Sequence, residues 1–126
     1  MAAPDYPAPS AGAAKAVAVA KVQLGKPYVF ATAGPETYDC SGLTQYAWAA
    51  AGVGMDHWTV AQYRSFPKVP VDALQPGDLA FFGSDIHHVG IYIGGGLMVD
   101  APFPGSNVRV TSIWTSSLVD YGVRPG

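Results

Sequence analysis

The stretch HVGIYIGGGLMVD, residues 88–100, decides the fold. In its first half apolar residues alternate with other types, three glycines follow, and the second half is again mostly apolar. Alternation of this kind is typical of a strand with one buried face, and glycines between two such runs favour a β-hairpin. The core face is then formed by Val89, Ile91 and Ile93, and His88 lies on the less apolar face.

The register of this hairpin decides whether His88 and Asp100 share a face. With residues 94–96 as the loop, Gly90 lies opposite Asp100, and His88 is the diagonal neighbour of Asp100. With residues 93–95 as the loop, His88 lies directly opposite Asp100. A two-residue loop would put Asp100 on the other face, because side chains repeat every two residues. Both three-residue loops therefore predict an imidazole beside a carboxylate.

Outside the hairpin, helix signals come first and strand signals afterwards. Helices are expected over 11–24, from 40 or 41 to 51, and near 59–65; strands are expected over 78–82, 88–93, 97–101 and 107–113. This order predicts an α+β domain with an antiparallel sheet. The second helix carries apolar residues at helical spacing, which predicts a core-facing stripe of Leu43, Tyr46, Ala47 and Ala50.

The length of 126 residues suits one domain. Residues 1–9 contain three prolines and are expected to be an extended, flexible lead-in. We accordingly divide the chain into an N-terminal extension, 1–20, which includes the start of the first helix, and a main domain, 21–126.

Composition excludes several classes of protein. Seven Lys and Arg residues and a net charge of −2 give no basic patch for nucleic acid or an anionic membrane. No apolar run is long enough for a transmembrane helix, and the first residues do not resemble a signal peptide, so the chain is either cytoplasmic or begins after a removed signal. A single cysteine excludes an internal disulfide. We expect a monomer.

Cys40 stands where the second helix is expected to begin, with Asp39 or Ser41 as its cap. The unpaired N–H groups and partial positive charge of a helix N-terminus stabilise a thiolate, and the Cys40 N–H could stabilise an oxyanion. A buried apolar cysteine is the alternative interpretation. His88 could serve as the base, with Asp100 either orienting it or lying solvated.

The other two histidines have weaker assignments. His87 is expected to be a strand-edge residue, and His57 to be a solvated loop residue.

Four segments resemble the NlpC-type peptidoglycan endopeptidases, cell-wall cysteine peptidases with a papain-like core, and in particular their actinobacterial members. The likeness covers about residues 22–124 and is carried by Gly25-Lys26-Pro27-Tyr28, Asp39-Cys40-Ser41-Gly42-Leu43, Pro76-Gly77-Asp78-Leu79 and His88-Val89-Gly90-Ile91-Tyr92-Ile93-Gly94. It implies a papain-like fold with Cys40 as nucleophile and His88 as general base. The third catalytic position falls at Asp100, where the family most often has histidine.

The same resemblance implies the rest of the site. Tyr28 would place its hydroxyl near the oxyanion, and Asp39 and Ser41 would line the subsite for the stem peptide. Trp58 either stacks on the substrate or covers the core. The implied target is an amide of the peptidoglycan stem, commonly between D-glutamate and meso-diaminopimelate, and this target implies export. No metal or organic cofactor is expected.

Two segments depart from the family pattern. Ala31-Thr32 stand where a glycine pair is usual, which restricts the backbone there. Asp56-His57 stand where Pro-Arg is common, at the rim of the expected substrate site.

Three other functions are compatible with parts of the pattern. The same fold could bind peptidoglycan without cutting it, and the same residues could transfer an acyl group to an amine or alcohol instead of water. A metal site of Cys40, His57, His87 and His88 is disfavoured, because the chain lacks the close ligand pairs of zinc sites.

Overall fold

The computed structural model describes residues 3–126, so the first two residues of the predicted lead-in lie outside the described residues. The helices over that range are α1 (Ala11–Val22), α2 (Cys40–Ala49), α3 (Thr59–Ser65) and a short 3₁₀ helix, η1 (Val71–Ala73). The strands are β1 (Lys68–Pro70), β2 (Leu79–Phe82), β3 (His88–Gly94), β4 (Leu97–Asp100), β5 (Arg109–Ser112) and β6 (Tyr121–Val123).

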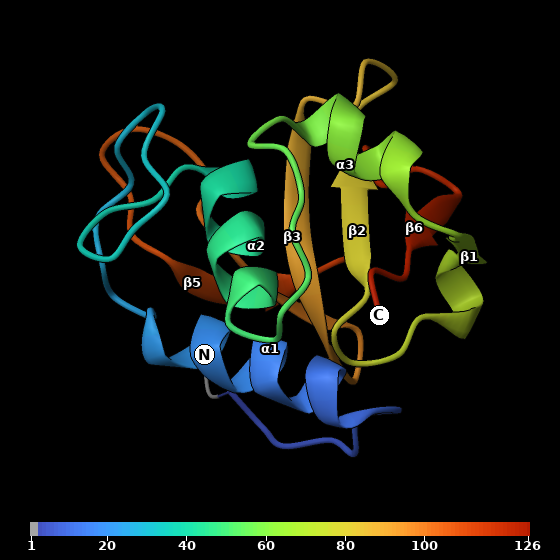
Figure 1. Cartoon of the computed structure of the whole chain (residues 1–126). Coiled ribbons are helices and arrows are strands. Elements are labelled where there is room, and N and C mark those ends of the chain that lie inside the picture. Colours follow the sequence, from blue (N-terminus) through green and yellow to red (C-terminus); the bar gives the residue numbers. More distant parts are fainter. Residues whose placement is uncertain (1–2) are drawn as a thin grey trace.

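The strands form one antiparallel sheet in the order β1-β6-β2-β3-β4-β5. Helix α2 packs on β3, and α1 packs on both α2 and β3 (Figure 1). Val89, Ile91 and Ile93 of β3 are fully buried in the core that also contains Leu43 and Ala47 of α2. The α+β class, the antiparallel sheet and the core face of β3 are therefore confirmed.

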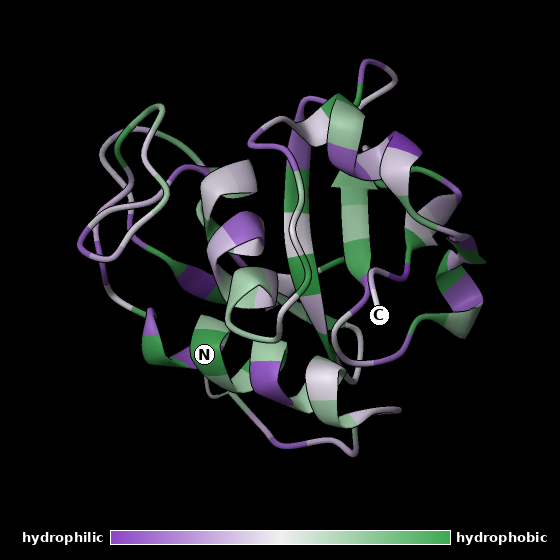
Figure 2. Cartoon of the chain, in the orientation of Figure 1, coloured by the Kyte–Doolittle hydropathy of each residue, from purple (hydrophilic) through white to green (hydrophobic). Residues whose placement is uncertain are grey.

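The other face of the sheet carries a smaller apolar cluster of Ala80, Phe82, Met98 and Ile113. Because β2 lies between β6 and β3 and has apolar clusters on both faces, all four of its residues are buried. Figure 2 shows hydrophobic bands on β2 and β3, and a mixture of hydrophobic and hydrophilic residues in the connecting loops. His88 lies on this second face, with its ring 5.5 Å from that of Phe82.

The expected stripe on α2 is wrong at one position. Leu43 and Ala47 are buried, but Ala50 is exposed and follows the end of the helix. The large buried side chain is instead Trp48, whose Nε1–H donates to the Gly77 carbonyl at 3.0 Å. The segment before β2 covers this side of α2, a long-range contact that helical spacing does not reveal.

The expected boundaries either coincide with the observed ones or differ from them by one or two residues, as is usual for helix and strand termini. Helix α1 ends at Val22 instead of 24, and the Gln23 N–H donates to the Ala20 carbonyl. The short helix over 59–65 is confirmed.

The hairpin reaches the predicted arrangement by a different turn. Ile91 pairs with Val99, which is the register predicted for the glycine-triplet loop. A β-bulge then shifts the register so that Gly94 pairs with Leu97, and only two residues form the turn. The extra residue of the bulge offsets the shorter turn, so Asp100 stays on the histidine face.

Two short strands were not expected from the sequence. Both β1 and β6 have only three residues, which is too few for an alternating pattern to be recognised, and β1 ends in a proline, which is unfavourable inside a sheet. An ion pair stabilises the edge of the sheet that β1 and β6 form. Arg124 donates from Nε and Nη2 to the two carboxylate oxygens of Asp78, each at 2.9 Å. Asp78 is almost fully buried, and hydrogen bonding to it raises the pKa of Arg124.

The described part of the lead-in packs on α1. Lys21 donates to the Pro4 carbonyl at 2.9 Å and pairs with Asp5 at 2.8 Å, while Tyr6 lies against Gly94 at the hairpin. In Figure 1 this segment runs below α1, at the opposite end of α2 from Cys40. Among residues 3–126, none of the helices is both long and apolar enough to span a bilayer.

We predict that Arg124→Met lowers the free energy of unfolding by about 2 kcal/mol, because it leaves the Asp78 carboxylate buried without its partner. The loss is smaller than for a fully buried pair, since the Arg124 side chain is 36% exposed. Urea unfolding followed by circular dichroism measures it. Arg64→Met, which removes an exposed arginine, is the control; equal stability of the two variants would contradict the prediction.

Candidate active site

Cys40 is the first residue of α2, and Asp39 is its N-cap. The Oδ1 atom of Asp39 accepts a hydrogen bond from the Gly42 N–H at 2.8 Å, which fixes the first turn of the helix. The cysteine is partly exposed, so the alternative interpretation as a fully buried apolar residue is wrong. Its thiol stands at the end of the helix where a negative charge is stabilised.

The Asp39 carboxylate binds two further segments. Its Oδ2 accepts from the Ala31 N–H at 2.8 Å, and His57 Nε2 lies 2.6 Å from Oδ1. His57 was expected to be solvated, but its side chain is only 27% exposed because the loop before α3 folds back onto the start of α2.

Gly42 is required by the close approach of the 31–33 loop. A Cβ atom at this position would lie 2.1 Å from the Thr32 carbonyl oxygen. The glycine of the Asp-Cys-Ser-Gly segment thus lets the loop that binds Asp39 pack directly on the first turn of α2.

Ala31 in this loop has φ +64°, the left-handed conformation that favours glycine. The departure noted in the sequence, alanine in place of a usual glycine, therefore falls on a position where a side chain strains the backbone. The hydrogen bond from the Ala31 N–H to Asp39 stabilises this strained backbone conformation.

His88 begins β3, and its Nε2 lies 2.8 Å from Oδ2 of Asp100 in β4. Asp100 is fully buried, which excludes the alternative that it is a solvated acid. Gly90 makes room for this pair, because a Cβ there would lie 2.4 Å from Met98 Sδ and 3.3 Å from Asp100 Cβ.

Arg109 is a member of this cluster that sequence reasoning missed. It pairs with Asp100 across β4 and β5, and its Nε donates to Asp100 Oδ1 at 3.0 Å. Opposite charges on two strands are a usable signal, but the loop between these strands leaves their register undetermined from sequence.

The environment of His88 has opposing effects on its pKa. Burial lowers the pKa of His88, but hydrogen bonding to Asp100, and then to Cys40, together with their charges, raises it overall to about 9. The imidazole is therefore held protonated at neutral pH.

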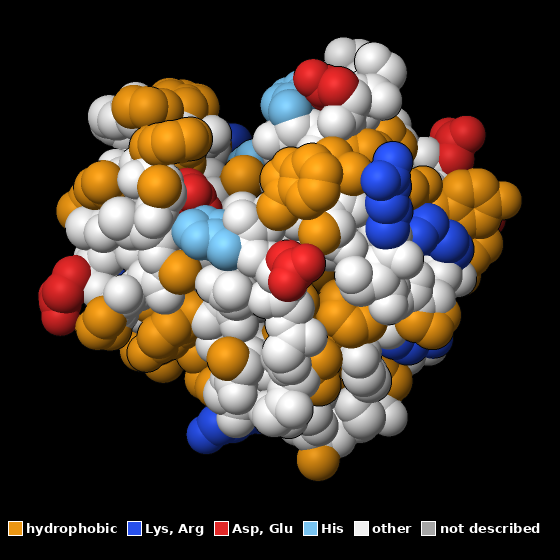
Figure 3. Space-filling view, turned by 45° about the horizontal axis from the view of Figure 1, so that its top comes forward, with side chains coloured by type: hydrophobic (Ala, Val, Ile, Leu, Met, Phe, Trp, Pro, Cys, Tyr) orange, Lys and Arg blue, Asp and Glu red, His pale blue; other side chains and the backbone are white. Residues whose placement is uncertain are grey.

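Two cavities meet at Cys40. One, of about 330 Å³, extends from Cys40 past His88 to Arg109; the other, of about 320 Å³, lies along Asp39, Ser41 and His57. Tyr28, Cys40 and His87 line both. We refer to them as the Arg109 cavity and the Asp39 cavity. Figure 3 shows histidine side chains around a hollow between two lobes of the surface, both of which carry some hydrophobic side chains.

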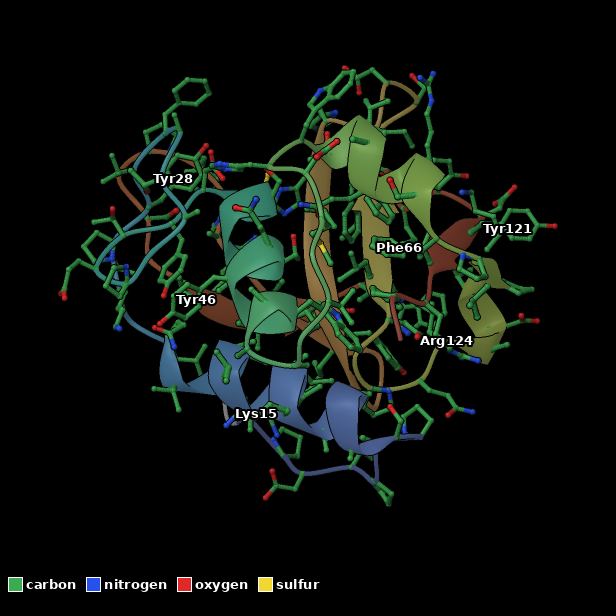
Figure 4. All side chains as sticks on the ribbon, in the orientation of Figure 1. Lys15, Tyr28, Tyr46, Phe66, Tyr121 and Arg124 are labelled. Carbon is green, nitrogen blue, oxygen red and sulfur yellow. The ribbon has the colours of Figure 1, made fainter. Side chains whose placement is uncertain are left out.

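Tyr28 lies next to the N-terminal end of α2 (Figure 4). Burial, and then the charges of Cys40 and Asp39, raise the pKa of Tyr28. Its hydroxyl therefore stays protonated and can donate a hydrogen bond at the junction of the two cavities.

The remaining predicted residues lie in the Asp39 cavity. Ser41 is nearly buried in its wall, and Trp58 lines it with 58% of its surface exposed. The alternative that Trp58 covers the core is therefore wrong. His87, expected at a strand edge, precedes β3 and pairs with Asp85 at 2.6 Å.

The structure does not bring together the four residues that were considered as alternative metal ligands, Cys40, His57, His87 and His88. Across the part of the chain that the structure describes, no three His, Cys, Asp or Glu side chains are arranged to hold a metal ion. His57, His87 and His88 each pair with a different aspartate.

Comparison with known proteins places these residues in a family context. The NlpC/P60 family model matches residues 25–123. The chain is 45% identical over 111 residues to a probable endopeptidase p60 of Listeria grayi, an alignment that covers 83% of this chain and 21% of that protein. It is 39% identical over 93 residues to the peptidoglycan endopeptidase RipA of Mycolicibacterium smegmatis, with 73% of this chain and 19% of that protein covered. The chain thus spans about a fifth of the length of these curated relatives.

Solved structures show the same architecture. The peptidoglycan hydrolase RipB of Mycobacterium tuberculosis superposes with a TM-score of 0.83 at 26% identity, covering 90% of this chain and 64% of that one. A family protein from Bacillus cereus gives a TM-score of 0.84 at 30% identity, with 94% of this chain and 41% of that one covered. These matches confirm the papain-like α+β fold predicted from the sequence.

We predict that Ala31→Gly raises the free energy of unfolding by about 0.5–1 kcal/mol, because glycine adopts positive φ without a steric cost. Chemical denaturation measures the change. Ala33→Gly is the control, since Ala33 does not have a positive φ and should be destabilised by the same substitution. A loss of stability in both variants would refute the strain at Ala31.

We predict that His88 titrates near pH 9 and that Asp100→Asn lowers its pKa, because a group that favours the imidazolium is removed. The raised pKa contributes stability that is complete below the unfolded value of 6.5 and is lost as pH rises to about 9. Imidazole NMR signals followed against pH provide the measurement. A wild-type midpoint near 6.5, or one unchanged in the variant, would contradict this arrangement.

Proposed function

Because the chain belongs to the NlpC/P60 family, we propose that it is a cysteine endopeptidase that hydrolyses an amide bond in peptidoglycan stem peptides. The observation that carries the proposal is the cluster at the meeting point of the two cavities: Cys40 at a helix N-terminus, with His88 held by buried Asp100. The relatives described above, an endopeptidase and a peptidoglycan hydrolase among them, support the same activity.

In this proposal the Cys40 thiolate attacks the carbonyl carbon of the scissile amide. His88, protonated at neutral pH, gives its proton to the leaving amine as the C–N bond breaks, which leaves an acyl-enzyme. The neutral imidazole then removes a proton from water, and the hydroxide releases the acyl group from sulfur. Asp100 orients the ring and stabilises the imidazolium throughout.

The oxyanion is stabilised by the Cys40 N–H and the Tyr28 hydroxyl. The first is one of the unpaired donors of a helix N-terminus, and the second remains protonated because its pKa is raised. Both groups border the two cavities, where the carbonyl oxygen of a substrate lying across Cys40 would stand.

We assign the acyl half of the stem peptide to the Asp39 cavity, with Asp39 and Ser41 in its wall and Trp58 stacking on the substrate. The bond proposed is that between D-glutamate and meso-diaminopimelate. Asp39 acts mainly through the segments it binds, because both of its oxygens accept hydrogen bonds within the protein.

Such a substrate places the protein outside the cell membrane or in the cell envelope. The division into an extension, 1–20, and a peptidase domain, 21–126, belongs to the same proposal, as does a monomeric state. Residues 3–9 line neither cavity at Cys40, so we do not assign them a shielding role.

We predict that the protein releases fragments from purified muropeptides and that Cys40→Ala abolishes release, because the nucleophile is lost while the cavities remain. Mass spectrometry of the digest identifies the bond. Ser65→Ala, at an exposed residue of α3 outside both cavities, is the control and should retain cleavage. Binding of peptidoglycan without fragments would show a non-catalytic module, and a product of new mass would show acyl transfer.

A further inference from the structure

Arg109 lies in the cleft, and the proposed reaction gives it no role. It belongs to β5, directly opposite Asp100, and its side chain lines the Arg109 cavity with 47% of its surface exposed. Asp100 is reached from two sides, by His88 on one oxygen and by Arg109 on the other.

Only one edge of the guanidinium is used by the protein. Nε donates to Asp100, and within residues 3–126 neither Nη atom has a hydrogen-bond partner. A guanidinium has five N–H donors in a rigid plane and binds carboxylates through two of them at once. Arg109 is therefore oriented by Asp100 and presents its remaining donors to the cavity.

The proposed reaction decides which part of the substrate occupies this cavity. His88 lines the Arg109 cavity but not the Asp39 cavity. Since His88 gives its proton to the leaving amine, the residue that carries this amine lies on the His88 side of Cys40. The Arg109 cavity thus receives the leaving residue, and the Asp39 cavity receives the acyl part.

The charges in the Arg109 cavity favour an anionic group. Its only carboxylate, Asp100, is fully buried and shared between His88 and Arg109. The other polar side chains of the lining, apart from His88 and Arg109 themselves, carry no negative charge when protonated: Tyr28, Cys40, His87, Thr111, Ser112, Thr115 and Ser117. Arg109 is the residue of this lining whose charge does not depend on pH near neutrality.

We infer that Arg109 is a specificity residue that binds a free carboxylate on the residue carrying the leaving amine. This inference rests on the proposed function. A diamino acid with a second carboxylate, such as meso-diaminopimelate, has the required group; the same residue with that carboxylate amidated, or lysine in its place, lacks it. Buried Asp100 is then a positioning residue for His88 and Arg109 together.

The test measures binding in the Cys40→Ala background, where peptides are not cut. Two peptides, L-Ala-γ-D-Glu-diaminopimelate with the distal carboxylate free or amidated, are titrated by calorimetry. We expect the free form to bind about tenfold more tightly, since a hydrogen-bonded charge pair is worth at least that factor. Adding Arg109→Gln should bring the two affinities together.

Two controls separate specificity from folding. Arg64→Gln removes an exposed arginine of α3 that lies outside both cavities and should keep the full preference. Arg109→Lys keeps a cation beside Asp100 but loses the planar fork, so it should fold and retain only part of the preference. Thermal unfolding of each variant reports on stability.

Equal binding of both peptides in the Cys40→Ala protein would overturn the inference. An Arg109→Gln variant that weakens the binding of both peptides by the same factor would also overturn it, and so would an Arg109→Lys variant that keeps the full preference. In either case Arg109 would act only through Asp100. If the protein with intact Cys40 cuts neither peptide while the binding preference is present, the proposed activity fails and the carboxylate site stands.

Discussion

The carboxylate of Asp39 joins the segments on which the cleft depends. It caps α2 through the Gly42 N–H, holds the strained Ala31 loop and pairs with His57 from the segment before α3. Because Cys40 is the next residue, this one carboxylate fixes where the helix begins and therefore where the thiol stands. Loss of the cap would free three segments at once, so the cost would exceed that of a single hydrogen bond.

A second buried carboxylate, that of Asp100, organises the wall of the cleft that the sheet forms. Asp100 adds a negative charge to the interior, and a charge in such a place requires partners. His88 and Arg109 supply them from the neighbouring strands β3 and β5. Hydrogen bonding to Asp100, and then to Cys40, raises the pKa of His88, and Asp100 also orients a guanidinium at the cleft. This one carboxylate therefore influences both the proposed proton donor and the proposed selectivity.

Several features followed from local patterns. The alternation in 88–93 identified the core face of β3, and Asp39 before Cys40 identified a capped helix start. The edge strands β1 and β6, the burial of Trp48 and the pairing of His57 could not be predicted, because each depends on a partner far away in the sequence. The turn of the hairpin was predicted only in part. Its glycines indicated where the chain turns, but the bulge could not be predicted, because several turn types accommodate the same residues.

By itself, the sequence determined the order of helices and strands, the position of Cys40 at a helix start and the face on which His88 lies, because these depend on neighbouring residues and on periods of 3.6 and 2. Only the tertiary structure decided that His88, Asp100 and Arg109 form one chain of contacts and that two cavities meet at Cys40. Strand register and loop packing depend on contacts between distant segments, and a linear pattern carries no distances between them.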